Sequence, residues 1–260
     1  MREVLEKLAK GLISIDEAEK LLKILAIDEI SNLAKLDINR EFRKGIPEII
    51  FAEGKRPEDL SEIALKMLNE RGRVIISRAE KKQIEVTRKA VPDDSVLQVN
   101  DMAGIVVIKM RDFEVKKTSG KIGILTAGTS DIRVAEEAKV VAEEMGCEVV
   151  TAYDVGVAGI HRLLPPLKEM IEKNVDVIIV VAGREGALPS VVSGLVDLPV
   201  IAVPTSMGYG FGEKGIGALM AMLQACSLGL AVVNIDGGVA AGAVAVLIAN
   251  RAAKFRKSQF

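Results

Sequence analysis

The chain has 260 residues, of which 49% are hydrophobic and 27% charged, and its formal net charge is -1. This balance predicts a globular chain with one large domain or two smaller ones, and it lacks the basic excess that nucleic-acid binding uses. Aromatic residues make up only 3% and tryptophan is absent, which argues against stacking platforms for single strands.

The number of cysteines and the lengths of the apolar segments indicate the cellular compartment that we expect. Cys147 and Cys226 are too few for a disulfide framework and fit a reducing cytoplasm. The first eight residues have the pattern of an amphipathic helix and lack the apolar region of a signal peptide. The apolar run over 239–249 is shorter than a membrane span requires. We therefore expect a cytoplasmic protein that contacts neither membrane nor nucleic acid.

The first third of the chain predicts a helical arm and a small domain. Leucine and isoleucine recur at helical spacing over residues 3–26, with a break at 11–14, so we expect two helices in an arm spanning 1–35. The role of this arm, structural or oligomeric, stays open. Residues 36–115 predict a small α+β domain. Its expected elements are a strand at 47–51, a helix at 58–69, a strand at 74–78 and two strands within 91–110.

After a polar linker, strands and helices alternate over residues 120–256. The strands are rich in Val, Ile and Ala without polar alternation, which is typical of strands buried on both faces of a parallel sheet. We therefore predict an α/β fold with a three-layer α/β/α arrangement. The expected strands are 122–125, 148–152, 177–182, 200–203 and 231–235. The expected helices are 134–145, 162–172, 188–195, 214–224 and 240–253.

The turn Thr-Ala-Gly-Thr-Ser-Asp at 126–131 opens this alternation. It leads from a buried strand into a helix, so free backbone N–H groups at the helix start can hold a phosphate or carboxylate. Alternatively, Ser130 or Asp131 only caps the helix.

Loops that follow the strands should meet at one edge of the sheet, where open parallel sheets bind ligands. These loops are rich in glycine, which lets a ligand approach the backbone closely. The single histidine cannot form a multi-histidine zinc centre. We expect a small-molecule site there. Its polar residues are Ser130, Asp131, Asp154, His161, Arg184, Glu185, Thr205, Ser206, Lys214, Asn234 and Asp236.

Three segments of this region resemble the phosphoribosyl-aminoimidazole carboxylase/mutase (PurE-like) family. They are the turn at 126–131, Val-Ala-Gly-Arg-Glu-Gly-Ala-Leu-Pro-Ser at 181–190 and Pro-Val-Ile-Ala-Val-Pro-Thr-Ser at 199–206. The chain departs from that family in two places. The Ser-Ala-His-Arg motif is here Thr-Ala-Tyr-Asp at 151–154, and Ala187 replaces the histidine of Ala-His-Leu-Pro. These departures argue against purine carboxylation.

The chain is similar over nearly its whole length to a related family, the LarB-type pyridinium-3,5-biscarboxylic acid mononucleotide synthases. The matching residues are Leu36, Asp37, Arg40, Pro47, Glu48, Gly54, Lys55, Cys226 and the run 233–236. The resemblance implies carboxylation of the pyridinium ring of nicotinate adenine dinucleotide with CO2 or bicarbonate. It also implies cleavage of the phosphoanhydride with release of AMP, a step toward a nickel-pincer cofactor, and a homo-octamer. It places the ring-attacking cysteine at Cys226.

The chemistry gives an independent reason for a cysteine. A cationic pyridinium ring cannot attack CO2, but a thiolate added at ring carbon 6 leaves a dienamine that is nucleophilic at carbon 5. Cysteine is both a strong nucleophile and a good leaving group. Alternatively, Cys226 is a small buried hydrophobic residue, as we expect for Cys147.

The remaining candidate residues divide by role. Glu185 is the candidate ring base, or a carboxylate at a helix start, and Asp131 is a further catalytic candidate. Asp154 is a candidate for binding ribose hydroxyls or directing water, and His161 with Arg162 is a candidate for binding phosphate. Alternatively, each of these residues caps its loop or packs against it. Further substrate-binding candidates are Gly128, Thr129, Ser130, Gly183, Thr205, Ser206, Gly208, Asn234 and Asp236. No covalent cofactor or dedicated metal cage is expected, and Mg²⁺ is a candidate for the anhydride step.

Two other functions remain as alternatives. The chain could be a 5-(carboxyamino)imidazole ribonucleotide mutase of purine synthesis, or a nucleotide-binding protein without turnover. Two helical segments, starting at Gly215 and Gly242, are apolar around much of their circumference, which predicts a homo-oligomer.

Overall fold

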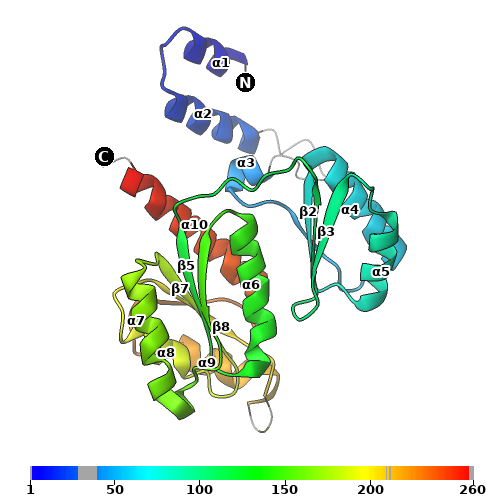
Figure 1. The fold of residues 1–260 in the computed structure, drawn as a ribbon. Helices are drawn as coiled ribbons and strands as arrows, with labels where there is room; N and C mark the ends of the chain where they lie inside the picture. The colour runs from blue at the N-terminus through cyan, green and yellow to red at the C-terminus, as the bar shows by residue number, and fades with distance from the viewer. Residues whose placement is uncertain (1, 29–39, 209, 211, 258–260) are drawn as a thin grey trace. The chain divides into compact units, whose positions relative to one another are not determined.

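The computed structural model describes residues 2–28, 40–208, 210 and 212–257, in two compact units that span 1–49 and 50–260 (Figure 1). The first unit contains α1 (Arg2–Ala9), α2 (Ile15–Asp28) and α3 (Arg40–Lys44). A reciprocal cap starts α2, because Ser14 N donates to Glu17 Oε2 at 2.8 Å and Glu17 N donates to Ser14 Oγ at 3.2 Å. The two predicted helices and the break between them are confirmed. The predicted boundary at residue 35 lies outside the described residues.

The small sheet has the order β1-β2-β4-β3, and β4 runs antiparallel to both β2 and β3. Its strands are β1 (Ile49–Phe51), β2 (Arg73–Ser77), β3 (Ser95–Asn100) and β4 (Ile105–Met110). Helix α4 (Pro57–Arg71) packs on it through Leu60 and Leu68. The sequence did not predict α5 (Lys81–Ala90), because half of its residues are charged and only Gln83, Ile84 and Thr87 are buried.

The large sheet is parallel throughout, with the order β6-β5-β7-β8-β9. Its strands are β5 (Lys121–Thr126), β6 (Glu148–Ala152), β7 (Val177–Ala182), β8 (Val200–Pro204) and β9 (Leu230–Val232). Every residue of β7 is buried, as expected for a central strand with helices on both faces. The predicted strand at 231–235 is too long, because the chain leaves β9 after Val232 and turns at Asn234, whose side chain accepts from Ile235 N.

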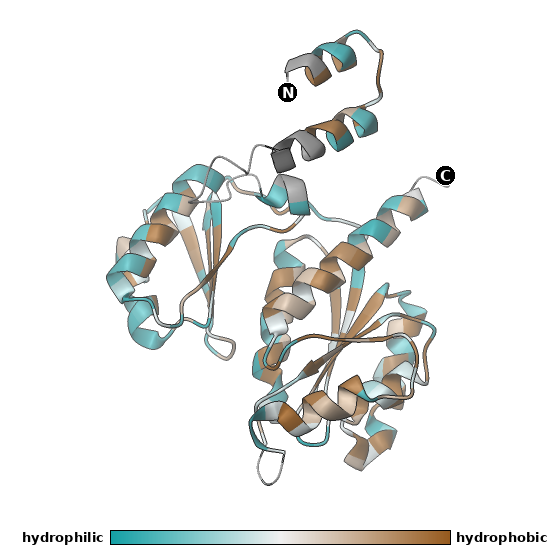
Figure 2. Ribbon diagram, turned by 180° about the vertical axis from the view of Figure 1, so that it is seen from behind, coloured by the Kyte–Doolittle hydropathy of each residue, from teal (hydrophilic) through white to brown (hydrophobic). Residues whose placement is uncertain are grey.

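Helices cover both faces of this sheet, which confirms the predicted three-layer α/β/α fold. On one face lie α6 (Ile132–Glu144) and α10 (Gly238–Lys257), and on the other α7 (Leu164–Glu172), α8 (Leu188–Ser193) and α9 (Ile216–Leu223). Figure 2 shows the apolar strands between these layers. The helices predicted from 162 and 214 begin later than expected. Short 3₁₀ segments at Val157–Arg162 and Glu213–Gly215 precede them, each interrupted by a non-helical residue.

Helix α10 is long and apolar enough to cross a membrane by length and composition alone. Its inward residues, however, are fully buried against α6 and the sheet, among them Ala241, Ala245 and Ala249. The contact is close, since a Cβ at Gly242 would meet Ala138 O at 2.8 Å. One face of helix α10 therefore packs into the hydrophobic core beside the large sheet.

The outer face of α6 also makes polar contacts with the small sheet inside the second unit. Asn100 Nδ2 donates to Glu136 Oε2 at 2.7 Å, and Lys109 Nζ lies 2.8 Å from Glu144 Oε1. Buried Arg73 donates to the Glu144 carbonyl oxygen. These contacts fix the small sheet beside α6.

Candidate functional site

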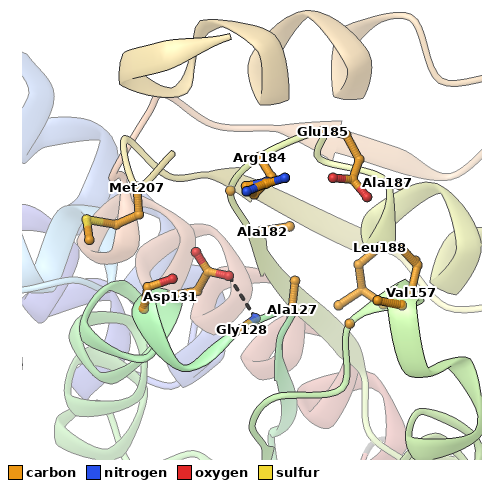
Figure 3. Close-up of a pocket in the computed structure, with 14 residues that line it drawn as sticks. Ala127, Gly128, Asp131, Val157, Ala182, Arg184, Glu185, Ala187, Leu188 and Met207 are labelled. Atoms are coloured by element: carbon orange, nitrogen blue, oxygen red, sulfur yellow. Dashed lines mark hydrogen bonds between the residues drawn. The ribbon is translucent and has the colours of Figure 1, made fainter. Parts of the chain in front are cut away.

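A cavity of about 370 Å³, here called cavity 1, lies where β5, β7 and β8 end (Figure 3). This is the edge at which the sequence predicted the site. Most of its wall is backbone and small side chains. Its lining residues are Ala127, Gly128, Ser130, Asp131, Gly156, Val157, Ala158, Ala182, Gly183, Arg184, Glu185, Ala187, Leu188 and Met207.

Asp131 joins two of the loops that form cavity 1. Its Oδ2 accepts from Gly128 N at 2.9 Å, and its Oδ1 accepts from the Thr205 hydroxyl at 2.7 Å. The carboxyl group is almost fully buried, and this burial raises its pKa although both hydrogen bonds lower it. Asp131 therefore shapes the turn at 126–131 and ties it to the end of β8.

Gly183 is required by the packing of the cavity floor. A Cβ at this position would meet Met207 O at 2.4 Å and Thr205 Oγ1 at 2.6 Å. Both distances are well inside van der Waals contact, so only glycine lets the loop after β7 pass this close to the loop after β8.

Glu185 and Arg184 stand on the rim and are exposed. Figure 3 shows the Glu185 carboxylate near Ala187, across the cavity from Asp131. Arg184 adopts a positive φ of 51°, a conformation uncommon outside glycine. The rim thus offers one acceptor and one cation above a small, largely apolar floor.

A second cavity, cavity 2, has a volume of about 450 Å³ and borders cavity 1 at Ser130 and Met207. Its walls come from the loops after β1 and β2, from α6, and from the loops after β8 and β9. Its lining residues are Glu53, Arg78, Ala79, Glu80, Ser130, Arg133, Val134, Glu137, Ser206, Met207 and Asp236.

Arg78 is the most constrained side chain of cavity 2. Its Nη2 donates to the Asp236 carbonyl oxygen at 2.6 Å, and its guanidinium lies 5.2 Å from the Phe51 ring centroid. It also lies 3.6 Å from Glu53 Oε2 and 3.7 Å from Glu137 Oε1. The backbone of Arg78 has a φ of 54°. Strain of this kind gathers at functional sites, where the surrounding contacts hold it in place.

Glu137 is a buried carboxyl group in the wall of cavity 2. Burial raises its pKa to about 7, against the lowering effects of Arg78, Arg133 and the backbone of Val239. Its Oε2 has no hydrogen-bond partner among the described residues. A buried acceptor without a donor is costly, which marks Glu137 as a functional candidate.

Two further predicted residues complete the junction of the loops. Ser206 N donates to Asp236 Oδ1 at 2.9 Å, and both residues line cavity 2. Thr205 is fully buried beneath them. Gly128, Ser130, Asp131, Gly183, Glu185, Thr205, Ser206 and Asp236 are thus brought together by the structure.

Other predicted residues lie outside both cavities. Arg162 Nη1 donates to Asp154 Oδ2 at 2.6 Å in an exposed pair, and His161 is exposed beside it. Thr129 and Gly208 are exposed, and Asn234 caps its own loop. Their roles in binding stay predictions.

Cys226 is exposed and lines neither cavity. It follows α9 and precedes β9, whose first residue, Leu230, pairs with Val200 at the start of β8. Cavity 1 lies beyond the last residues of β8, whereas the segment that contains Cys226 leads into β9 beside the first residues of β8. The Ser227 hydroxyl donates to Ser190 O at 2.8 Å, which holds this segment along α8. Cys147, by contrast, is buried in the core as predicted.

Within the described residues, no group of three or more His, Cys, Asp or Glu side chains could hold a metal ion. The donors of the two cavities do not form a ready-made cage for Mg²⁺. We therefore derive no step through a metal, and the Mg²⁺ requirement stays a prediction.

Family models match both parts of the chain. Residues 27–111 match the LarB/PurE-like N-terminal domain, and residues 121–259 match AIR carboxylase. The chain belongs to the LarB/PurE-like family. It is a LarB-type protein, with a PurE-like domain placed after an N-terminal domain.

Relatives of this LarB-type protein fall into two groups. It is 50% identical over 251 residues to the uncharacterized protein MJ0165 of Methanocaldococcus jannaschii, a match covering 96% of each chain. It is 33% identical over 133 residues to the probable N5-carboxyaminoimidazole ribonucleotide mutase of Methanothermobacter thermautotrophicus, covering 49% of this chain and 37% of that one. The mutase of Pyrococcus abyssi is 32% identical over 139 residues, covering 52% of this chain and 76% of its own. A carboxylase-type function on a nucleotide follows from the family.

Sequence reasoning missed most of cavity 2. Arg133, Val134 and Glu137 follow Ser130 at helical spacing and form one face of α6. The sequence shows this helical spacing, but a charged helix face is usually exposed to solvent. Arg78 and Glu53 come from a separate part of the chain, and no local signal connects them to α6.

Proposed function

We propose that this LarB-type protein carboxylates carbon 5 of the pyridinium ring of nicotinate adenine dinucleotide and cleaves its phosphoanhydride. The products would be AMP and pyridinium-3,5-biscarboxylic acid mononucleotide. The observation that carries the proposal is the pairing of a LarB-type N-terminal domain with a PurE-like domain in one chain. Supporting it, cavity 1 and cavity 2 adjoin at Ser130, as the two halves of a dinucleotide would require.

The proposed carboxylation balances without an external oxidant. The Cys226 thiolate adds to ring carbon 6, and the ring nitrogen takes up the electron pair. The resulting dienamine attacks CO2 through carbon 5. A base removes the carbon-5 proton, the carbon–sulfur bond breaks, and the aromatic cation and the thiolate are restored. Hydrolysis of the anhydride consumes one water molecule.

Cavity 1 is the proposed place of the pyridinium ring. Its floor of alanine and glycine fits a flat ring, and the backbone N–H groups of Thr129 and Ser130 are the proposed phosphate donors at the start of α6. Glu185 on the rim is the proposed base for the carbon-5 proton. Asp131 is the proposed organiser of the turn.

Cys226 lines neither cavity of its own chain, so we propose that it serves cavity 1 of a neighbouring copy. It is surrounded by exposed apolar residues of the kind that associate. Leu228 is 91% exposed and Leu223 65%, and Met220 is exposed on the same helix. Such a surface favours a homo-oligomer, and the family resemblance suggests an octamer.

The first experiment incubates the protein with nicotinate adenine dinucleotide and bicarbonate and follows both products by mass. Cys226→Ser should abolish carboxylation, because an alkoxide is much harder to form than a thiolate. Cys147→Ala is the matched control. Carboxylated product at the wild-type rate from Cys226→Ser would refute the nucleophile assignment.

A mixing experiment tests whether the thiol comes from a second copy. Cys226→Ser and the cavity variant Gly183→Ala should each be inactive alone. Assemblies formed from both chains should recover activity, because some sites then combine an intact cavity with an intact partner cysteine. If each cysteine serves its own cavity, every site stays defective and no activity returns.

A second candidate function is N5-carboxyaminoimidazole ribonucleotide mutase, favoured by relatives of that name that are 32–33% identical over the PurE-like domain. Against it, Ala187 lines cavity 1 where the purine enzymes resembled by the sequence carry histidine. The same assay with N5-carboxyaminoimidazole ribonucleotide discriminates the two. Turnover of neither substrate would favour a nucleotide-binding protein.

A further inference from the structure

We propose that cavity 2 binds a nucleoside monophosphate, with Arg133 at its phosphate and Glu137 at its ribose. We further assign the adenylate half of the dinucleotide to this cavity. That assignment rests on the proposed function, whereas mononucleotide binding by cavity 2 does not.

Size and position support this ligand class. A volume of about 450 Å³ is within the range of small-molecule sites, roughly 300–1,000 Å³. Ser130 and Met207 line both cavities. A ligand with two nucleoside halves and a short diphosphate can therefore extend from one cavity into the other past Ser130.

The phosphate end of the site lies at the first turn of α6. Ser130 and Arg133 are three residues apart and line the same wall. The Arg133 guanidinium makes no ion pair with any of the described residues, so it is available to an anionic ligand. The 13-residue helix α6 directs its positive end toward the same place. A hydroxyl, a guanidinium and a helix start together suit a phosphate.

The ribose end lies one turn further along α6. Glu137 follows Arg133 by four residues, which is about 6 Å along a helix. Its carboxyl group is 2% exposed, and the missing side chain of Gly238 leaves it room, since a Cβ there would meet Oε2 at 3.0 Å. A carboxylate facing vicinal hydroxyls is a common way to recognise ribose. Ribose hydroxyls would supply the donor that Glu137 Oε2 lacks.

The opposite wall comes from the small α+β sheet. Arg78 is held by Glu53, by the Asp236 carbonyl oxygen and by the Phe51 ring, so it is ordered before any ligand arrives. A preordered cation costs little entropy when an anion binds. This gives the N-terminal domain a role in the site, as the part that closes cavity 2 over α6.

The test is equilibrium binding of AMP by calorimetry to the full-length protein. Arg133→Ala should weaken AMP binding about tenfold and leave adenosine binding unchanged, because adenosine lacks the phosphate. Glu137→Gln should weaken AMP binding and reduce the preference for AMP over 2′-deoxy-AMP. Lys139→Ala and Glu143→Gln, on the same helix but outside the cavity, should bind AMP as the wild type does. Circular dichroism confirms that each variant is folded.

Competition separates this inference from the proposed function. With nicotinate mononucleotide saturating cavity 1, AMP should still bind at its full stoichiometry. Mutual exclusion of the two mononucleotides would overturn the inference, as would absent AMP binding or equal losses in the control variants. Failure of carboxylation together with the expected AMP results would refute the proposed function and leave cavity 2 as a mononucleotide site.

Discussion

The two cavities adjoin but are lined by different types of residue. Half of the residues that line cavity 1 are glycine or alanine, whereas more than half of those that line cavity 2 are charged. Cavity 1 belongs entirely to the PurE-like domain, and cavity 2 includes residues from both domains of the family. The comparison indicates that cavity 1 selects its ligand by shape and backbone contacts, and cavity 2 by charge. Each mode can be disrupted separately.

The largest effect should come from Gly183→Ala, which fills the floor of cavity 1. The new Cβ would lie 2.4 Å from Met207 O and must displace the loop after β8. We expect at least a hundredfold loss of carboxylation, and a loss of about 1–3 kcal/mol in the free energy of unfolding. Product analysis and urea denaturation measure the two effects.

Gly194→Ala, at the end of α8, is the matched control in the same domain. The nearest atom to its Cβ would be Ser190 O at 3.4 Å, an ordinary contact, so activity and stability should stay near the wild-type values. AMP binding to cavity 2 should fall much less than carboxylation after Gly183→Ala, because the displaced loop forms only one of its walls. Equal loss of both ligands would mean that the cavities do not act separately.

The buried carboxyl group of Glu137 in cavity 2 should make the free energy of unfolding depend on pH. The folded-state pKa of Glu137 is about 7, above the ordinary 4.5, because burial outweighs the nearby cations Arg78 and Arg133. The folded state therefore binds the Glu137 proton more tightly than the unfolded state does. This tighter binding stabilises the fold fully below pH 4.5, and the stabilisation is lost as the pH rises to about 7. The difference between the two pKa values corresponds to about 3 kcal/mol in the free energy of unfolding.

Glu137→Gln cannot ionise and should not show this loss. Its free energy of unfolding, relative to the wild type, should increase by up to about 3 kcal/mol between pH 4.5 and pH 8. Urea denaturation at several pH values without nucleotide provides the measurement, and Glu85→Gln, which removes an exposed carboxyl group on α5, is the control. Parallel stability curves for wild type and Glu137→Gln would show that Glu137 does not titrate in this range.

The sequence was sufficient to predict cavity 1, for a clear physical reason. Buried strands without polar alternation must be parallel and covered on both faces, and the loops after parallel strands meet at one edge. Ser130 and Asp131 follow β5, whereas Gly183 and Glu185 lie about 50 residues later in the chain and follow β7, its neighbour in the sheet. Strand order alone therefore brings them together.

Cavity 2 and the setting of Cys226 could not be predicted in this way. Glu137 becomes a buried acid only because another domain and the start of α10 cover its helix face, and such packing leaves no local pattern. Helix α5, half of whose residues are charged, was missed for a related reason, since only three of its residues are buried. For Cys226, the family resemblance predicted a role, but only the structure shows that this residue lines neither cavity.

The smallest effect concerns the hydrogen bond from Thr205 to Asp131 beneath both cavities. Thr205→Val keeps the shape but removes the donor to Asp131 Oδ1, while Gly128 N still donates to Oδ2. The pKa of Asp131, already raised by burial, should rise further, because the Thr205 hydrogen bond lowers it. The variant should lose about 1–2 kcal/mol near neutral pH, and less at a pH where Asp131 is protonated. Thr126→Val is the matched control: its buried hydroxyl accepts from Asp154 N at 3.0 Å, a neutral bond whose loss should not vary with pH. Urea denaturation of both variants across the pH range decides the matter, and identical, pH-independent losses would show that the Asp131 carboxylate does not depend on Thr205.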